Sequence, residues 1–94
     1  MISSEQVRAG RALLNWQASD LAHAAKLSLA TIERLEAPPG PLAADASVVE
    51  ALRGALEAAG LDFIDENGGG MGVRLKRPDG GAIAIEDLNA SNDE

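Results

Sequence analysis

Residues 16–36 contain two short amphipathic helical patterns with almost no chain between them, and this feature constrains the fold most. In the first pattern apolar residues recur at spacings of three and four, and the second is similar, so each predicted helix buries one stripe. The apolar positions are Ala18, Leu21, Ala22 and Ala25, followed by Leu27, Ile32 and Leu35. Ser28 is the predicted N-cap of the second helix, and only Lys26 and Leu27 separate it from the first helix. The two helices must therefore cross steeply, as in a helix-turn-helix. The start of the second helix then projects from the body, in a shape that the major groove of duplex DNA accepts.

A further helix is predicted over residues 4–14, before this pair. Ser3 and Gln6 have the spacing of a capping box, and Ile2 with Val7 have that of a hydrophobic staple. The expected inner face of this helix consists of Val7, Gly10, Leu13 and Leu14.

A fourth helix is predicted over residues 46–59, after a proline-rich loop. The segment Ala37, Pro38, Pro39, Gly40 and Pro41 must end the preceding helix, because proline lacks an amide donor and disfavours helical geometry in the residue before it. Apolar residues then recur at spacings of three and four, and Gly60 is the expected left-handed stop. These apolar residues are Val49, Leu52, Leu56 and Ala59.

Beyond Gly60 the apolar period changes from helical to alternating, which predicts three short strands around residues 61–63, 73–75 and 83–85. Residues 67–70 and 78–81 supply turn chemistry between them. The fold class is therefore α+β, with four helices followed by a small C-terminal antiparallel sheet or hairpin. We expect a helix-turn-helix domain over 1–60, a β-strand dimerisation extension over 61–87 and a flexible acidic tail over 88–94.

A small sheet with open edges tends to pair with another copy of itself. One short recognition helix also contacts few base pairs, whereas a two-fold dimer reads two half-sites. The sequence therefore predicts a homodimer through the strands. The expected interface residues are Phe63, Ile64, Val73 and Leu75.

Composition limits the chemistry that the chain can carry. It has no cysteine and one histidine, His23, and shows no nucleophile elbow or metal-ligand spacing, so we expect no enzyme, no cofactor and no metal site. The start of the chain has no signal-peptide pattern and no stretch is long enough to cross a bilayer, which favours a cytoplasmic protein. The net charge of −7 lies entirely in residues 41–94, because residues 1–40 carry four basic and four acidic side chains.

The sequence resembles the small bacterial Xre-type, phage-repressor-like helix-turn-helix regulators. The resemblance covers residues 1–78, and its most distinctive parts are Leu14 to Trp16, the Ser28, Thr31, Ile32 and Glu36 pattern, and the segment ALEAAGLDFIDENGGG. It implies a homodimer that docks its second and third helices on duplex DNA and regulates transcription.

The resemblance also implies which residues contact DNA. Leu29, Ala30 and Arg34 occupy outward positions of the third helix that read bases, and only Arg34 has a fork suited to guanine. The other candidate contacts, chiefly to phosphates, are Arg11, Gln17, Ala18, Ser28 and Thr31. The chain departs from the family where Gln17 and Ala18 replace Ser and Gln, and where Lys26 replaces the turn glycine, so Lys26 must take a left-handed or altered turn.

A second interpretation stays open beside DNA binding. The chain keeps the helix-turn-helix frame with a sparse reading surface, as expected of an adaptor or antagonist that binds another transcription regulator or RNA polymerase. An exposed Leu29, a neutral N-terminal half and an acidic C-terminal half support it.

Overall fold

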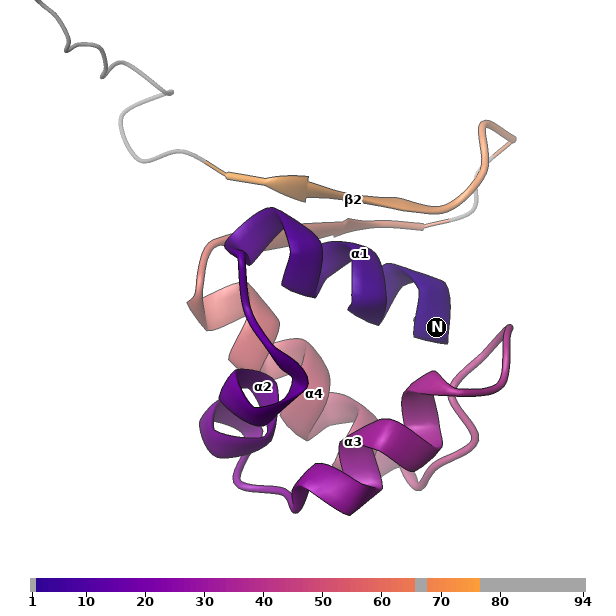
Figure 1. Ribbon diagram of the computed structural model, residues 1–94. Coiled ribbons are helices and arrows are strands. Elements are labelled where there is room, and N and C mark those ends of the chain that lie inside the picture. Colours follow the sequence, from indigo (N-terminus) through magenta and orange to yellow (C-terminus); the bar gives the residue numbers. More distant parts are fainter. Residues whose placement is uncertain (1, 66–67, 77–94) are drawn as a thin grey trace, which may run out of the picture.

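The computed structural model describes residues 2–65 and 68–76 and has four helices followed by an antiparallel hairpin, a small α+β fold as the sequence predicts (Figure 1). The predicted strand at 83–85 and the predicted tail at 88–94 lie outside the described residues. Among the described helices, none has the length and apolar character needed to cross a bilayer. The elements are α1 (Ser4–Leu14), α2 (Ala18–Ala25), α3 (Leu29–Glu36), α4 (Ala46–Ala58), β1 (Leu61–Ile64) and β2 (Gly72–Leu75).

Helix α1 begins with the predicted capping box. The Ser3 backbone N–H donates to Gln6 Oε1 at 2.9 Å, and the Gln6 N–H donates to Ser3 Oγ at 3.1 Å. The proline-rich loop is tied to this helix start, because the Ser4 N–H donates to the Gly40 carbonyl at 2.9 Å and the Ser4 hydroxyl to the Pro38 carbonyl at 2.7 Å. The loop therefore returns the chain from α3 to α1 before α4 begins.

One hydrophobic core joins all four helices and the hairpin. Its largest buried side chains, each less than 2% exposed, come from all four helices, from β1 and from Ile2, two residues before α1. They include Ile2, Val7, Leu21, Ile32, Leu52, Leu56 and Leu61. The prediction that Leu13 faces inward is wrong, since its side chain is 45% exposed, whereas Gly10 is buried and Leu14 packs against the core as predicted.

Strands β1 and β2 pair in an antiparallel register that places Leu61 opposite Leu75 and Phe63 opposite Val73. Leu61 and Phe63 are buried, so these four side chains share the face toward the helices. Asp62 and Arg74 lie opposite each other on the other face and form an ion pair. Figure 1 shows the hairpin over α1, with α2 and α3 on the side of α1 away from it.

Gln6 fixes the hairpin to the start of α1. Its side-chain Nε2 donates to the Gly72 carbonyl at 2.9 Å and to the Ile64 carbonyl at 3.2 Å, at the paired ends of the two strands. The amide is buried, so its acceptor atom serves the helix cap and its donor atom serves the hairpin. One buried side chain thus ties both strands of the hairpin to the start of α1.

Candidate nucleic-acid interface

Helices α2 and α3 are joined by a three-residue turn. Lys26 closes α2 with φ 59° and ψ 43°, the left-handed conformation predicted for the position where the resembling family has glycine. The Leu27 N–H then donates to the Ala22 carbonyl at 2.9 Å, which turns the chain sharply. Ser28 is the N-cap of α3, and its hydroxyl accepts the Thr31 N–H at 3.1 Å. Two short helices joined by a tight turn, with a capped start to the second, are therefore present.

Helix α3 is anchored by one face and free on the other. Ile32 and Leu35 are 1% and 4% exposed and hold the helix against the core. On the opposite face Leu29 is 42% exposed, and Ala30 and Arg34 are also exposed. The outward positions predicted for base contacts thus share one accessible face beginning at the first residue of the helix.

The residues flanking this face supply polar groups and little positive charge. Ser28 is exposed and Thr31 half-buried, and their hydroxyl oxygens lie 2.8 Å apart. Lys26 and Arg34 are the cations of the turn and α3, and the exposed Glu33 lies beside Arg34. This surface carries little positive charge. It is therefore better suited to hydrogen bonding with a few groups of a ligand than to general attraction of a polyanion.

At the start of α2, Gln17 is exposed and Ala18 is half-buried against the core. The Asp20 carboxylate accepts the Gln17 backbone N–H at 2.8 Å, so an acidic side chain in the first turn stabilises the helix start. Of the two predicted contacts here, Gln17 presents its side chain to solvent, and Ala18 presents only part of a methyl group.

Arg11 has a different environment from the one predicted. Its Nε donates to Glu36 Oε2 at 2.7 Å and its Nη2 to Glu36 Oε1 at 2.6 Å, while Nη1 donates to the Trp16 carbonyl at 3.2 Å. Donation of these hydrogen bonds to the Glu36 carboxylate raises the pKa of Arg11 above its ordinary value. The Arg11 side chain is 21% exposed, so we interpret Arg11 as a positioning residue that joins α1, the entry to α2 and the end of α3.

The predicted interface residues of the hairpin divide between its two faces. Phe63 is 8% exposed and packs inside the protomer, with the Arg53 guanidinium 5.7 Å from its ring centre, so Phe63 does not offer its side chain to a second copy. Val73 is half-buried and Leu75 is 38% exposed, on the same face as Phe63 but on the outer strand. Ile64 is half-buried and belongs to the opposite face with Asp62.

Two further features bear on cofactors and ligands. Among residues 2–65 and 68–76, no three His, Cys, Asp or Glu side chains gather as a metal site would require.

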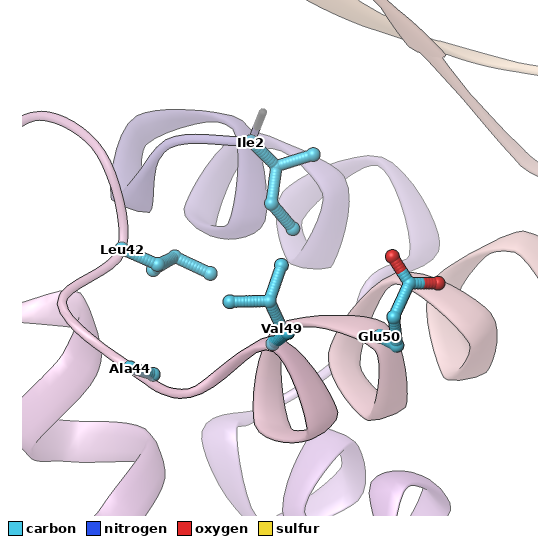
Figure 2. Close-up of a pocket in the computed structure, with 6 residues that line it drawn as sticks. Ile2, Leu42, Ala44, Val49 and Glu50 are labelled. Atoms are coloured by element: carbon cyan, nitrogen blue, oxygen red, sulfur yellow. The ribbon is translucent and has the colours of Figure 1, made fainter.

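A pocket of about 270 Å³ opens between the start of the chain, the segment after the proline-rich loop and the start of α4. Figure 2 shows Ile2, Leu42 and Val49 pointing toward one another, with the Glu50 carboxylate to one side. Apart from Glu50, the side chains that line it are apolar.

No protein-family model matches the chain, and no curated protein matches its sequence. The geometry of α2, α3 and the hairpin is therefore what indicates the function.

Proposed function

We propose that this protein is a sequence-specific, double-stranded DNA-binding regulator of transcription that acts as a homodimer. The observation that carries the proposal is the accessible face of α3, on which Leu29, Ala30 and Arg34 project while Ile32 and Leu35 are buried. A helix held by one face and free at its N-terminal end is the shape that enters a major groove.

Each group on this face has a chemically suitable partner on DNA. The Arg34 guanidinium can donate two hydrogen bonds to the O6 and N7 atoms of guanine, a contact that discriminates by roughly 1–3 kcal/mol. Leu29 and Ala30 offer apolar contact to a thymine methyl group. Gln17, Ser28 and Thr31 are suited to phosphate oxygens, which set the position of the helix without reading sequence.

The scarcity of cations predicts modest affinity. Lys26 and Arg34 are the basic side chains of the turn and α3, and Arg11 is engaged by Glu36. Few phosphates are then neutralised per protomer, so the slope of log affinity against log salt is shallow and specificity requires two protomers on two half-sites.

Fluorescence anisotropy tests the proposal directly. The duplexes are the DNA upstream of the protein's own coding sequence, a site selected from a randomised pool, and a random duplex of equal length. We expect Arg34→Ala to lower affinity for the selected site about tenfold or more, from the loss of one bidentate contact per protomer, and to reduce the salt slope.

Lys76→Ala is the matched control, because it removes the same charge from the exposed end of the hairpin. It should leave the preference for the selected site unchanged. Affinity for every duplex equal to that for random DNA at low salt, in a correctly folded protein, would overturn the proposal.

The exposed Leu29 favours one alternative, a protein-interaction module that binds another transcription regulator or RNA polymerase. A 42% exposed leucine at the first position of α3 is suited to an apolar pocket as well as to a thymine methyl. Leu29→Ser separates the two functions when it is compared with Arg34→Ala. Loss of partner binding in Leu29→Ser, with no selective DNA binding in the wild type, would support the adaptor or antagonist.

A further inference from the structure

Among residues 2–65 and 68–76, the backbone groups at the outer edge of β2 have no strand partner. The Lys76 N–H donates to the Gly60 carbonyl at 2.7 Å, which makes this pair a hydrogen-bonded one. Hydrogen-bonded and non-hydrogen-bonded pairs alternate along antiparallel strands, so Asp62 with Arg74 is also hydrogen-bonded. The N–H and C=O groups of Val73 and Leu75 therefore point away from β1, toward an edge that meets no further strand among the described residues.

The side chains along the same edge are apolar and accessible. Met71 is 49% exposed, Leu75 is 38% exposed, and Val73 between them is half-buried. Val73 and Leu75 lie on the face toward the helices, and Met71 lines a hollow there with Ala9. An edge that combines free backbone groups with exposed apolar side chains is a template for strand addition.

We propose that the partner at this edge is β2 of a second copy, paired antiparallel about a two-fold axis through Val73. In this register Val73 of each protomer faces Val73 of the partner subunit, and the two exchange both backbone hydrogen bonds. Met71 lies opposite Leu75 of the partner subunit, so the two most exposed apolar side chains of the edge cover each other. Arg74 lies opposite Gly72 of the partner subunit, which separates the two guanidinium groups.

Moving the two-fold axis by one residue, which shifts the pairing of the strands by two residues, is less favourable. It would centre the axis on Arg74 and place two arginines directly opposite each other, an arrangement that destabilises paired strands. The pattern Met71, Val73, Leu75 is thus self-complementary about its central residue. That symmetry is what an interface between identical chains requires.

The surface beside the edge has room for the partner's side chain. A hollow of about 150 Å³ lies between α1 and β2, lined by Glu5, Gln6, Ala9, Met71, Gly72 and Val73. Leu75 of the partner subunit, opposite Met71, would lie at this hollow. Its apolar side chain would then pack against Ala9 and Val73, which adds apolar burial to the backbone hydrogen bonds.

The orientation of the helices agrees with this pairing, in an argument that rests on the proposed DNA-binding function. The two-fold axis of an antiparallel pair is perpendicular to the sheet, so both protomers lie on one side of the joined sheet. Since α2 and α3 lie on the side of α1 away from the hairpin, both copies of α3 then face the same direction (Figure 1). Packing through the opposite face, that of Ile64 and Arg74, would point the two α3 helices away from each other.

Charge exchange at the predicted cross-strand pair tests the register. Sedimentation at tens of micromolar measures dimerisation. Met71→Glu alone and Leu75→Lys alone should each weaken it about tenfold or more. Each places one charge twice per dimer in the seam, which is the apolar contact made by Met71, Val73 and Leu75 of the two protomers. The combined variant should recover most of the loss, since each introduced carboxylate then lies opposite an introduced ammonium of the partner. Ile64→Lys, on the outer face, should leave the dimer unchanged.

Cysteine crosslinking tests the axis in the same full-length chain, which has no cysteine. Opposed residues of a hydrogen-bonded pair have Cα atoms about 5.5 Å apart, within the range of a disulfide. Val73→Cys should therefore form a covalent dimer on mild oxidation, and Ile64→Cys should not. A monomeric wild type, the result expected if the predicted strand at 83–85 covers this edge instead, would overturn the pairing. No recovery in the combined charge variant, or crosslinking at Ile64→Cys alone, would also overturn it.

The outcomes separate this inference from the proposed function. A wild-type dimer with the predicted crosslink but without selective DNA binding leaves the seam standing and removes the regulator. A monomeric protein that binds a selected duplex specifically would support the regulator and overturn the seam.

Discussion

Arg11 and Glu36 form a two-point ion pair that joins α1 to the last residue of α3, with N–O distances of 2.7 and 2.6 Å. Glu36 lies at the C-terminal end of α3, where the helix dipole disfavours a carboxylate, and Arg11 offsets that cost. The same guanidinium also donates to the Trp16 carbonyl at 3.2 Å, so Arg11 ties α1 to the entry of α2 as well as to the end of α3.

Breaking this pair from one side should destabilise the fold. We expect Arg11→Met to lower the free energy of unfolding by about 2 kcal/mol, less than for a fully buried pair because the Arg11 side chain is 21% exposed. Urea denaturation measures the loss, and Arg11→Met with Glu36→Leu should be more stable than the sum of the two single changes predicts. Strict additivity in this double-mutant cycle would contradict a direct coupling.

Gly10 allows α1 to pack directly on β1. A Cβ at this position would lie 2.5 Å from Leu61 Cδ2, and Leu61 is fully buried, so its side chain has little room to move. We expect Gly10→Ala to lower the free energy of unfolding by about 1–3 kcal/mol.

Gly54 is the matched control for this substitution. It lies in α4, and an added Cβ there meets nothing within 4 Å. Gly54→Ala should therefore raise the free energy of unfolding by about 0.5–1 kcal/mol through helix propensity. Equal effects of the two substitutions in urea denaturation would show that Gly10 is not a packing requirement.

Lys26 holds a left-handed conformation that costs a residue with a side chain roughly 1–2 kcal/mol. Lys26→Gly should relieve this strain and raise the melting temperature, and at the same time remove a cation from the proposed DNA surface. We therefore expect higher stability with slightly weaker, less salt-dependent DNA binding. Lys26→Ala keeps the strain and removes the charge, so a melting temperature equal to that of Lys26→Gly would contradict the backbone argument.

The features that the sequence predicted correctly are mostly local. The Ser3 and Gln6 capping box, the Ser28 cap and the left-handed Lys26 and Gly60 all depend on residues within a few positions of one another. Their geometry follows from backbone chemistry that operates before any tertiary contact forms.

Contacts between distant residues gave no comparable signal. Arg11 and Glu36 are 25 positions apart, and Gln6 reaches carbonyls 58 and 66 positions away. A capping pattern explains why Gln6 follows Ser3 by three residues, but it does not reveal that the free amide nitrogen holds the hairpin. An arginine in a helix-turn-helix region likewise suggests a phosphate contact until its internal partner is known.

The alternation of apolar and polar residues along the strands was ambiguous in a similar way. It placed Val73 and Leu75 on one face of their strand, but the predicted interface also included Ile64, which lies on the face opposite to Phe63. Nor does alternation state whether a face meets the protein's own helices or a second copy. Phe63 lies on the strand covered by the protomer's helices and is buried, whereas Leu75 lies on the outer strand and remains 38% exposed. Whether one of these side chains is buried therefore depends on which of the two strands carries it, and not on the face of the sheet to which it belongs.

Acid should weaken the connection between α1 and the proline-rich loop. The Glu5 carboxylate accepts the Gly40 N–H at 3.1 and 3.2 Å, and its pKa is lowered by its own backbone N–H, by the Gly40 N–H and by the charge of Arg8. Since the folded-state pKa lies below the unfolded value of about 4.3, the stabilisation is complete above that value and is lost as the pH falls through the folded-state pKa.

Glu5→Gln should therefore be less stable than the wild type at pH 7, and the difference should shrink below about pH 4. Urea denaturation from pH 7 to pH 3 measures this convergence. Glu50→Gln removes one exposed carboxylate from α4 and controls for the loss of charge. A difference that stays constant down to pH 3 would show that the Glu5 carboxylate is not the group responsible.

The two roles of Gln6 can be separated by a single substitution. Glutamate is accepted at the third position of a capping box, so Gln6→Glu retains an oxygen acceptor for the Ser3 N–H. It replaces the donor that binds the Gly72 and Ile64 carbonyls with a second oxygen, which leaves a buried carboxylate against two acceptors. We expect a loss of about 2–3 kcal/mol in the free energy of unfolding at pH 7.

Hydrogen exchange shows where that loss occurs. In Gln6→Glu the amides of β1 and β2 should exchange faster than in the wild type, with a smaller change at α3, because the hairpin loses its attachment to α1. As the pH falls, the protonated carboxyl regains an O–H donor, so the stability deficit relative to the wild type should decrease. A deficit that is uniform over all amides and independent of pH would mean that Gln6 acts only through the cap of α1.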